Sequence, residues 1–198
     1  GGGIHGGCVA RDAAHRCLKV ALIERNDSGA ATSHNSLKLV HGGFRYLQHS
    51  DLRRLRQSVR ERRYWLWAAP HLVRPLKFVM PLYGHTTRGP EALWIASQLY
   101  RLLSMDRNRG LGTTHRVPNG GIVSKAACQG LIPGVESTGL SGATYWYDGQ
   151  ILDADRLLLD CLSDAAAQGA VAANYVEATG FLGDAQQVQG VRAVDRLT

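Results

Sequence analysis

The chain has 198 residues, of which 44% are hydrophobic and 20% are charged, with a formal net charge of +7. This composition excludes a disordered or collagen-like chain, and the apolar runs are too short for a membrane-spanning helix. The four cysteines form no C-x-x-C pair and match no zinc framework. We therefore expect reduced thiols and no metal site.

The first element in chain order is a glycine-rich turn that leads into a helix. Gly1, Gly3 and Gly6 form a G-x-G-x-x-G motif, and the small residues after it suit a helix that packs on a sheet. The aliphatic run at 17–24 predicts a strand that ends in Glu24. Because a strand precedes the first glycine in a βαβ unit, we expect the chain to be the N-terminal part of a longer protein, with this first strand missing.

Further helices and strands follow a loop-rich segment at 25–50. Apolar periodicity predicts helices at 51–67, 90–105, 124–134 and 153–169. Alternating or β-branched runs predict strands at 76–83, 142–151, 170–178 and 187–194, a turn at Asp148-Gly149 and a mobile loop at 106–120. This order predicts a doubly wound α/β domain interrupted by a second domain. We expect the first domain at 1–75, the second at 76–150 and the return to the first at 151–198.

The helix expected at 51–67 is amphipathic and strongly basic. Its apolar stripe consists of Leu52, Leu55, Val59 and Leu66. The helix also carries six arginines, which are Arg53, Arg54, Arg56, Arg60, Arg62 and Arg63. We interpret them as a solvated basic face, with contact to anionic lipid headgroups as a sharper alternative. A nucleic-acid-binding module is an alternative of another class, and steep salt dependence of binding would identify it.

The glycine motif, the helix after it and Glu24 together predict a dinucleotide site. Gly1 permits a tight turn, Gly3 lets the backbone approach a pyrophosphate, and Gly6 lets the helix pack on the sheet. The helix N-terminus offers N–H groups and a positive dipole end to the phosphates. Glu24 stands near the offset at which an acid binds a ribose hydroxyl, which disfavours the 2′-phosphate of NADP. NAD and FAD both remain compatible with these residues.

The stretch TSHNSLKLVHGGFRYL at 32–47 favours FAD over NAD. The hydroxyl groups and the charge that follow the ribose-binding acid are on Thr32, Ser33, Ser36 and Lys38. The ribityl chain and ring of a flavin extend beyond the pyrophosphate, where such groups can meet them. Gly42 and Gly43 let the backbone pass flat beside a ring. His41 and Arg45 can then reach the reacting face, and Arg45 offers a permanent planar charge for a phosphate or carboxylate.

Five segments, in order and over most of the chain, resemble the FAD-dependent glycerol-3-phosphate dehydrogenases. They are GGGIHG, ALIERND, ATSHNSLKLVHGGFRYLQ, ERRYWLWAAPHLVRPLKFVMPLY and YWYDGQILDADRLLLD. The resemblance implies an α/β fold, in which a Rossmann-like FAD-binding domain without its first strand is interrupted by a mixed α+β substrate or cap domain. It also implies oxidation of sn-glycerol 3-phosphate at C2 to dihydroxyacetone phosphate. Hydride would pass to flavin N5 and the electrons would leave to a membrane quinone.

The resemblance further implies roles for individual residues. Arg45 and Tyr46 would face the substrate as catalytic residues, and His41 would orient the flavin or relay a proton near it. Val176 would bring its backbone to the adenine end of FAD. The residues along the flavin would be Thr32, Ser33, Ser36, Lys38, Leu39 and His41.

Partners and location follow from the same resemblance. We expect glycerol 3-phosphate and a quinone as partners, and no nucleic acid. We also expect a cytoplasmic location, with peripheral contact to the inner face of the cytoplasmic membrane through the helices at 51–67 and 90–105. A homodimer is compatible with the sequence.

Several alternatives stay open. The chain departs from the family at His34 and Asn35, where a second serine often follows Ser33. An oxidase that passes electrons to oxygen, or a related flavoenzyme that acts on an amine, would carry similar residues. A non-catalytic remnant is a third alternative. Because the family's remaining catalytic groups lie in later segments, we expect no turnover by residues 1–198 alone.

Overall fold

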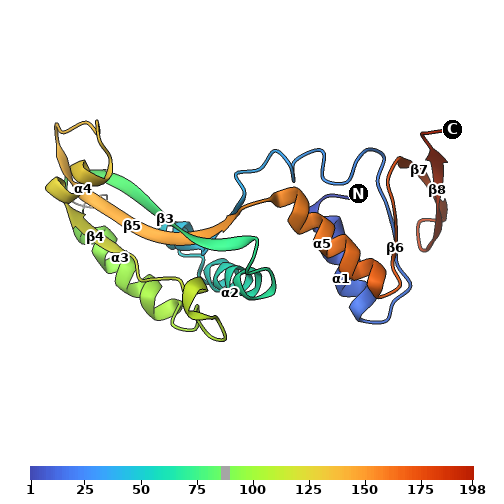
Figure 1. Ribbon diagram of the computed structural model, residues 1–198, viewed down its shortest axis with the longest axis horizontal. Coiled ribbons are helices and arrows are strands. Elements are labelled where there is room, and N and C mark those ends of the chain that lie inside the picture. Colours follow the sequence, from blue (N-terminus) through green and yellow to red (C-terminus); the bar gives the residue numbers. More distant parts are fainter. Residues whose placement is uncertain (86–89) are drawn as a thin grey trace. The chain divides into compact units, whose positions relative to one another are not determined.

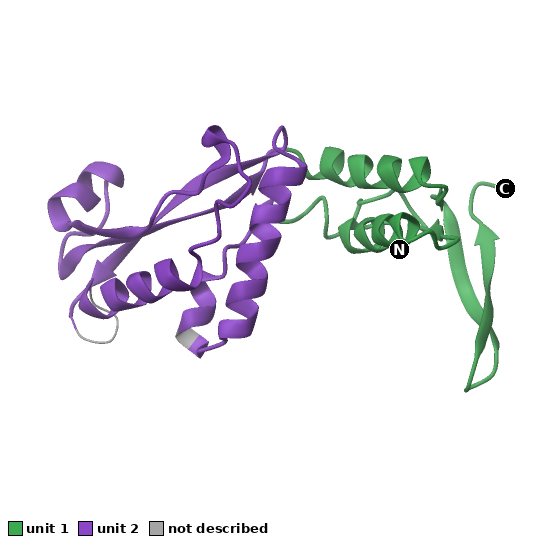
Figure 2. Ribbon diagram, turned by 90° about the horizontal axis from the view of Figure 1, so that it is seen from below, with its two compact units in different colours: residues 1–37, 153–198 green, residues 38–152 purple. Residues whose placement is uncertain are grey.

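Figure 1 shows the computed structural model of the chain, which describes residues 1–85 and 90–198. The chain forms two compact units (Figure 2). The first unit consists of residues 1–37 and 153–198, and the second consists of residues 38–152.

The first unit combines two helices, a parallel strand pair and a hairpin. Its elements are α1 (Ile4–His15), β1 (Ala21–Ile23), α5 (Ala154–Ala167), β6 (Val171–Ala173), β7 (Val176–Gly183) and β8 (Val188–Asp195). β1 pairs with β6 in parallel, and β7 pairs with β8 antiparallel. α1 and α5 lie side by side (Figure 1). Small side chains permit this close packing, and the buried cluster consists of Ala10, Ala14, Ala165 and Ala170.

Two strands of the first unit differ from the sequence prediction. The strand expected at 17–24 is reduced to β1, because only residues 21–23 pair with β6. Cys17, at the turn after α1, has a left-handed backbone with a φ of 61°. The strand expected at 170–178 is divided into β6 and β7. Tyr175 lies between them with a φ of 57°, which interrupts the extended chain. The bend separates the parallel pair from the β7–β8 hairpin.

The second unit is built on two long antiparallel strands. Its elements are β2 (Leu39–Val40), the 3-10 helix η1 (Phe44–His49), α2 (Leu52–Ala68), β3 (Val73–Tyr83), α3 (Pro90–Leu103), the 3-10 helix η2 (Thr113–His115), β4 (Gly121–Ser124), α4 (Lys125–Leu131) and β5 (Leu140–Ile151). β5 pairs with β3 along its length and also with β2 and β4. The division expected at residue 75 would cut β3, whereas the compact units divide between residues 37 and 38, ahead of β2.

The turn expected at Asp148-Gly149 is wrong, because β5 runs through both residues without a break. Gly149 pairs with Val40 on one side and with Pro75 on the other. A Cβ at Gly149 would lie 3.3 Å from atoms of Val40 and Val73. Glycine at this position therefore allows three strands to approach closely and does not form a turn.

The arginines of α2 do not form the single basic face expected from the sequence. Arg62 is only 1% exposed, and Arg56 and Arg63 both bind the carboxylate of Asp106. The exposed arginines are Arg53, Arg54 and Arg60. The apolar stripe is confirmed at Leu55, Val59 and Leu66, while Leu52 is 45% exposed. Because half of the six charges are buried or paired with Asp106, the nucleic-acid alternative loses its main support.

The segment at 106–120, expected as a mobile loop, is fastened by internal hydrogen bonds. Arg107 donates to the carbonyl of Val117 at 3.1 Å and to the side chain of Asn119 at 2.5 Å. The N–H of Val117 donates in turn to Asn108 Oδ1 at 2.7 Å. These bonds hold the chain between α3 and β4.

Helix α3 begins at Pro90 as predicted and exposes several large apolar side chains. They belong to Trp94, Ile95, Leu99 and Leu102. No helix in the two described ranges is long and apolar enough to cross a membrane.

Candidate functional site

The residues selected from the sequence fall into two groups, one in each unit. In the first unit they line a cavity of about 360 Å³. The predicted residues on its wall are Gly1, Gly3, Gly6, Glu24, Thr32 and Ser33. The structure thus brings together the glycine motif, the acid at the end of β1 and the first hydroxyls of the 32–47 stretch.

Close packing requires glycine at two positions of the opening turn. A Cβ at Gly6 would lie 1.9 Å from the carbonyl oxygen of Gly1, so no side chain fits there. A Cβ at Gly2 would lie 2.8 Å from the Cβ of Glu24. The turn is therefore folded tightly against both the helix and the end of β1.

The N-terminus of α1 presents hydrogen-bond donors to the cavity. Gly3 is the N-cap and supplies no side-chain cap, so the first N–H groups of the helix are left for other acceptors. The N–H of Ile4 donates to the hydroxyl of Ser33 at 2.9 Å. The hydroxyl of Ser36 donates to the carbonyl of Ser33 at 3.2 Å, so Ser36 supports this loop and lies off the cavity wall.

Glu24 is held at the end of β1 by backbone donors. Its carboxylate accepts hydrogen bonds from the N–H of Gly2 at 2.6 Å and of Asn26 at 2.9 Å. Partial burial opposes ionisation, but these donors outweigh it and lower the pKa of Glu24 below its ordinary value. The N–H of Val176 donates to the carbonyl of Glu24 at 2.8 Å, which places the start of β7 beside the acid.

His34 and Asn35, the two residues that depart from the family pattern, stabilise their own loop. His34 Nδ1 lies 2.8 Å from Asp155 Oδ2 in the first turn of α5. The side-chain amide of Asn35 donates to the carbonyl of Ala31 at 3.0 Å. Both side chains therefore make contacts that stabilise the loop, at the position where a second serine often follows in the family.

The wall of this cavity fits the ADP half of FAD. It combines a glycine turn too tight for side chains, a helix N-terminus without a side-chain cap, and an acid whose lowered pKa keeps it ionised. The glycine turn and the helix N-terminus suit a pyrophosphate, and the ionised acid suits a ribose hydroxyl.

In the second unit, His41, Arg45 and Tyr46 line a larger cavity of about 620 Å³. Gly43, which also lines the cavity, immediately precedes η1 and has a φ of 83°, a left-handed conformation that lets the chain turn sharply after β2. The other residues on the wall are Phe44, His49, Phe78, Met80, Trp146 and Asp148. The structure therefore gathers the three residues that the sequence selected as catalytic around one space.

Three aromatic side chains on the wall of the larger cavity stack on one another. Trp146 stacks between Phe44 and Phe78, with ring centroids 5.6 and 5.5 Å apart and interplanar angles of 15°. Trp146 was not among the site residues selected from the sequence. The three rings come from η1, β3 and β5, so no local pattern could have grouped them.

Asp148 joins this cavity to the interior and was missed by sequence reasoning as a site residue. Its carboxylate accepts hydrogen bonds from the N–H of Gly42 at 2.5 Å, Arg62 Nη1 at 3.1 Å and Trp146 Nε1 at 3.1 Å. Two features of the sequence indicated that this carboxylate is buried and paired. A single acid in the strand segment YWYDG is costly to bury without a cation, and Arg62 interrupts the apolar stripe of α2.

The remaining selected residues, Lys38, Leu39 and Gly42, lie in and beside β2 and off the wall of the larger cavity. Lys38 has a φ of 55°, and its carbonyl accepts from the N–H of Ile151 at 2.7 Å. A Cβ at Gly42 would lie 1.9 Å from Arg62 Nη1. Glycine at this position therefore makes room for a buried guanidinium.

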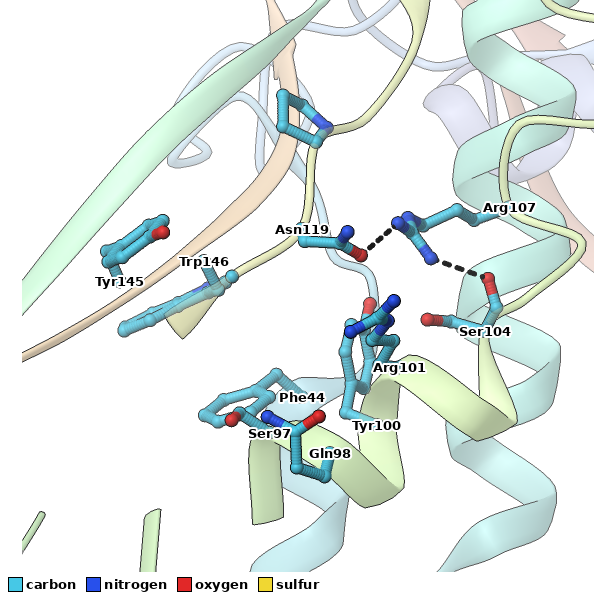
Figure 3. A pocket seen from close by; sticks show the side chains of 12 residues that line it. Phe44, Ser97, Gln98, Tyr100, Arg101, Ser104, Arg107, Asn119, Tyr145 and Trp146 are labelled. Atoms are coloured by element: carbon cyan, nitrogen blue, oxygen red, sulfur yellow. Dashed lines mark hydrogen bonds between the residues drawn. The ribbon is translucent and has the colours of Figure 1, made fainter. Parts of the chain in front are cut away.

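A third cavity of about 50 Å³ shares Phe44 and Trp146 with the larger one (Figure 3). Arg107 donates to Asn119 and to the carbonyl of Ser104 at its edge. Burial lowers the pKa of Arg107. This volume suits about one or two water molecules and is too small for an organic substrate.

Comparisons with known proteins find related sequences along the whole chain. A family model described as FAD dependent oxidoreductase matches residues 1–197. The chain is 36% identical to a glycerol-3-phosphate dehydrogenase of Synechocystis sp., over 100% of this chain and 34% of that relative. It is 35% identical to the mitochondrial glycerol-3-phosphate dehydrogenase of Rattus norvegicus, over 100% of this chain and 28% of that relative. The chain thus spans about a third of the length of these curated relatives.

A solved structure of a glycerol-3-phosphate dehydrogenase also has a similar fold. The glycerol-3-phosphate dehydrogenase from Bacillus halodurans complexed with FAD superposes on 100% of this chain and 29% of its own chain, with a TM-score of 0.66 and 27% identity. The comparisons confirm the predicted α/β FAD-binding fold, the resemblance to glycerol-3-phosphate dehydrogenases and FAD as the cofactor.

Proposed function

We propose a function on one premise: the chain belongs to the FAD dependent oxidoreductase family. It supplies FAD-binding and substrate-binding residues to an enzyme that oxidises sn-glycerol 3-phosphate to dihydroxyacetone phosphate. The observation that carries this proposal is the cavity of about 620 Å³ that gathers Arg45, Tyr46 and His41 beside an aromatic wall. The names of the Synechocystis and rat relatives support the choice of substrate.

The first unit holds the ADP half of the cofactor in this proposal. The glycine turn and the N-terminus of α1 bind the pyrophosphate, Glu24 binds a ribose hydroxyl, and the backbone at Val176 contacts the adenine. The residues that follow the course of the flavin are Thr32, Ser33, Ser36, Lys38, Leu39, His41 and Gly42. The two-electron oxidation at C2 is the chemistry that FAD supplies when bound.

The second unit binds and orients the substrate. Arg45 binds the phosphate group, because its planar guanidinium can make two charge-assisted hydrogen bonds to it. Tyr46 contacts the glycerol backbone, and His41 takes the proton of the C2 hydroxyl. The stacked aromatic rings exclude water from one side of the cavity.

We further propose a quinone as the electron acceptor, with peripheral membrane contact through α3 and the exposed arginines of α2. Oxygen is the competing acceptor. Peroxide release during turnover in air, without loss of rate when quinone is omitted, would show that oxygen accepts the electrons.

The first test uses the complete gene product. We expect two visible flavin absorption bands in the purified protein, and bleaching of the longer-wavelength band when glycerol 3-phosphate is added without air. Glycerol without its phosphate serves as the control and is expected to bleach the band far more slowly. A colourless protein, or equal bleaching by both compounds, would contradict the proposal.

Arg45→Ala tests the phosphate contact. We expect KM for glycerol 3-phosphate to rise roughly 10- to 100-fold, because a charge-assisted hydrogen bond contributes about 1.5–3 kcal/mol. Arg109→Ala is the matched control, because it removes the same charge at an exposed position after α3 that lies off the wall of the larger cavity. Steady-state kinetics compare the two variants. An unchanged KM in Arg45→Ala would remove Arg45 from the substrate site.

A further inference from the structure

The carboxylate of Asp148 reaches from the interior of the second unit to the cavity assigned to the substrate. Oδ1 accepts a hydrogen bond from Arg62 Nη1 at 3.1 Å, and the two residues are 5% and 1% exposed. The other oxygen, Oδ2, lies 3.6 Å from His41 Nδ1, and the His41 side chain is 64% exposed. One carboxylate therefore links a buried cation to an imidazole on the cavity wall.

The backbone next to His41 is fixed on both sides by the same network. The N–H of Gly42 donates to Asp148 Oδ1 at 2.5 Å, and its carbonyl accepts from the hydroxyl of Tyr100 at 2.8 Å. Arg62 Nη2 donates to that hydroxyl at 3.1 Å. Burial raises the pKa of Tyr100, so its hydroxyl keeps its proton and remains a donor. The loop cannot shift without breaking these buried and partly buried hydrogen bonds.

We propose that Asp148 is a positioning residue that acts through His41, an inference that rests on the proposed function. With a carboxylate facing Nδ1, the neutral imidazole of His41 keeps its proton on Nδ1 and has its free electron pair on Nε2. Nε2 takes the proton of the C2 hydroxyl. The hydrogen on C2 leaves with its electron pair as hydride to FAD, the oxidant of the proposed reaction, and a C=O double bond forms.

The charges around the cavity explain why a carboxylate is needed behind His41. Arg45 on η1 carries a permanent positive charge on the same wall, and His49 and Tyr46 are the other titratable groups that η1 contributes to it. When His41 takes up the proton of the substrate, this wall gains positive charge in addition to that of Arg45, and the carboxylate of Asp148 behind His41 offsets it.

The test compares Asp148→Asn and His41→Gln, singly and together, in the complete gene product with FAD. Asparagine keeps the shape and one acceptor oxygen but removes the charge. We expect Asp148→Asn to lower kcat roughly 10- to 100-fold while KM changes less than about threefold, because Arg45 is untouched. Since Asp148 acts through His41, the double variant is expected to be within about twofold of His41→Gln. Additive losses would overturn the inference.

Nitrogen NMR of labelled histidine gives a readout that does not depend on activity. The signals of His41 are identified by their loss in His41→Gln. We expect the Nδ1–H tautomer in the wild type and a shift towards the Nε2–H tautomer in Asp148→Asn. An Nε2–H tautomer in the wild type would overturn the inference even if Asp148→Asn fails to fold. A wild type that shows the expected tautomers but does not oxidise glycerol 3-phosphate would overturn the proposed substrate and leave the positioning of His41 supported.

Discussion

Replacement of Gly42 by alanine is expected to lower the free energy of unfolding by about 3 to 5 kcal/mol. A Cβ at this position would lie 1.9 Å from Arg62 Nη1 and 2.6 Å from the Tyr100 hydroxyl oxygen. Arg62 Nη1 cannot withdraw freely, because it donates to the carbonyl of Tyr147 and to Asp148. The added methyl group must either separate a buried ion pair or push β2 away from β5. Both changes leave charged or polar groups buried without partners.

Gly130→Ala is the matched control for this substitution in the same unit. Gly130 lies in α4, and a Cβ there meets no heavy atom within 4 Å. Alanine in an exposed helix is expected to raise the free energy of unfolding by up to about 1 kcal/mol. Guanidinium chloride denaturation, followed by tryptophan fluorescence, measures both variants. A loss below about 1 kcal/mol in Gly42→Ala would contradict the close packing of Arg62 against this loop.

The elements that the sequence predicts well are those whose signals lie within one helical turn. α5 follows Asp153, whose side chain accepts from the N–H of Arg156, and ends before Gly169, whose φ is 89°. α2 likewise follows Asp51, which accepts from the N–H of Arg54. Capping and periodicity act locally, so the order of residues is sufficient to locate such helices.

The Arg62–Asp148 pair shows why the interior of the second unit was harder to predict. Residues 55, 59, 62 and 66 follow the spacing of one helical stripe, so Arg62 occupies an apolar position of α2. Counting the arginines as one basic face concealed this position. The partner acid lies 86 residues away in β5, and no local signal joins the two. Reading a charge inside an apolar stripe as a buried ion pair would have indicated that Asp148 is buried and not in a turn.

The walls of the two cavities differ in how far they could be predicted from the sequence. The glycine motif and Glu24 mark a known chain geometry, and the structure gathers them on one wall. The aromatic rings of the larger cavity come from three separate elements, and they meet only after β3 and β5 have paired in register. Chemistry carried by a contiguous motif is therefore visible in the sequence, whereas a surface assembled by strand pairing is not.

Gly6→Ala is expected to weaken FAD binding by the complete gene product at least about 100-fold, equivalent to about 2.8 kcal/mol. A Cβ at Gly6 would lie 1.9 Å from the carbonyl oxygen of Gly1. The obstacle is backbone, so it cannot rotate away as a side chain would. Relief requires α1 to move away from the glycine turn, which displaces the helix N-terminus from the position proposed to bind the phosphates. Fluorescence titration of the apoprotein with FAD measures the loss.

Substitutions of Gly3 and Gly180 in the first unit distinguish a loss of apoprotein stability from a loss of FAD affinity. A Cβ at Gly3 would lie 3.1 Å from the hydroxyl oxygen of Ser33, which accepts the hydrogen bond from the N–H of Ile4, whereas a Cβ at Gly180 meets no heavy atom within 4 Å. Gly6→Ala is expected to lower both apoprotein stability, by about 1 to 3 kcal/mol, and FAD affinity. Gly3→Ala is expected to lower FAD affinity with a smaller loss of apoprotein stability, because Gly3 lies on the wall of the cavity proposed for the phosphates and only a side-chain hydroxyl has to shift. Gly180→Ala is expected to lower neither. If Gly3→Ala and Gly6→Ala both bound FAD as tightly as the wild type, the pyrophosphate would have to lie elsewhere, and the cavity around the N-terminus of α1 would lose its assignment.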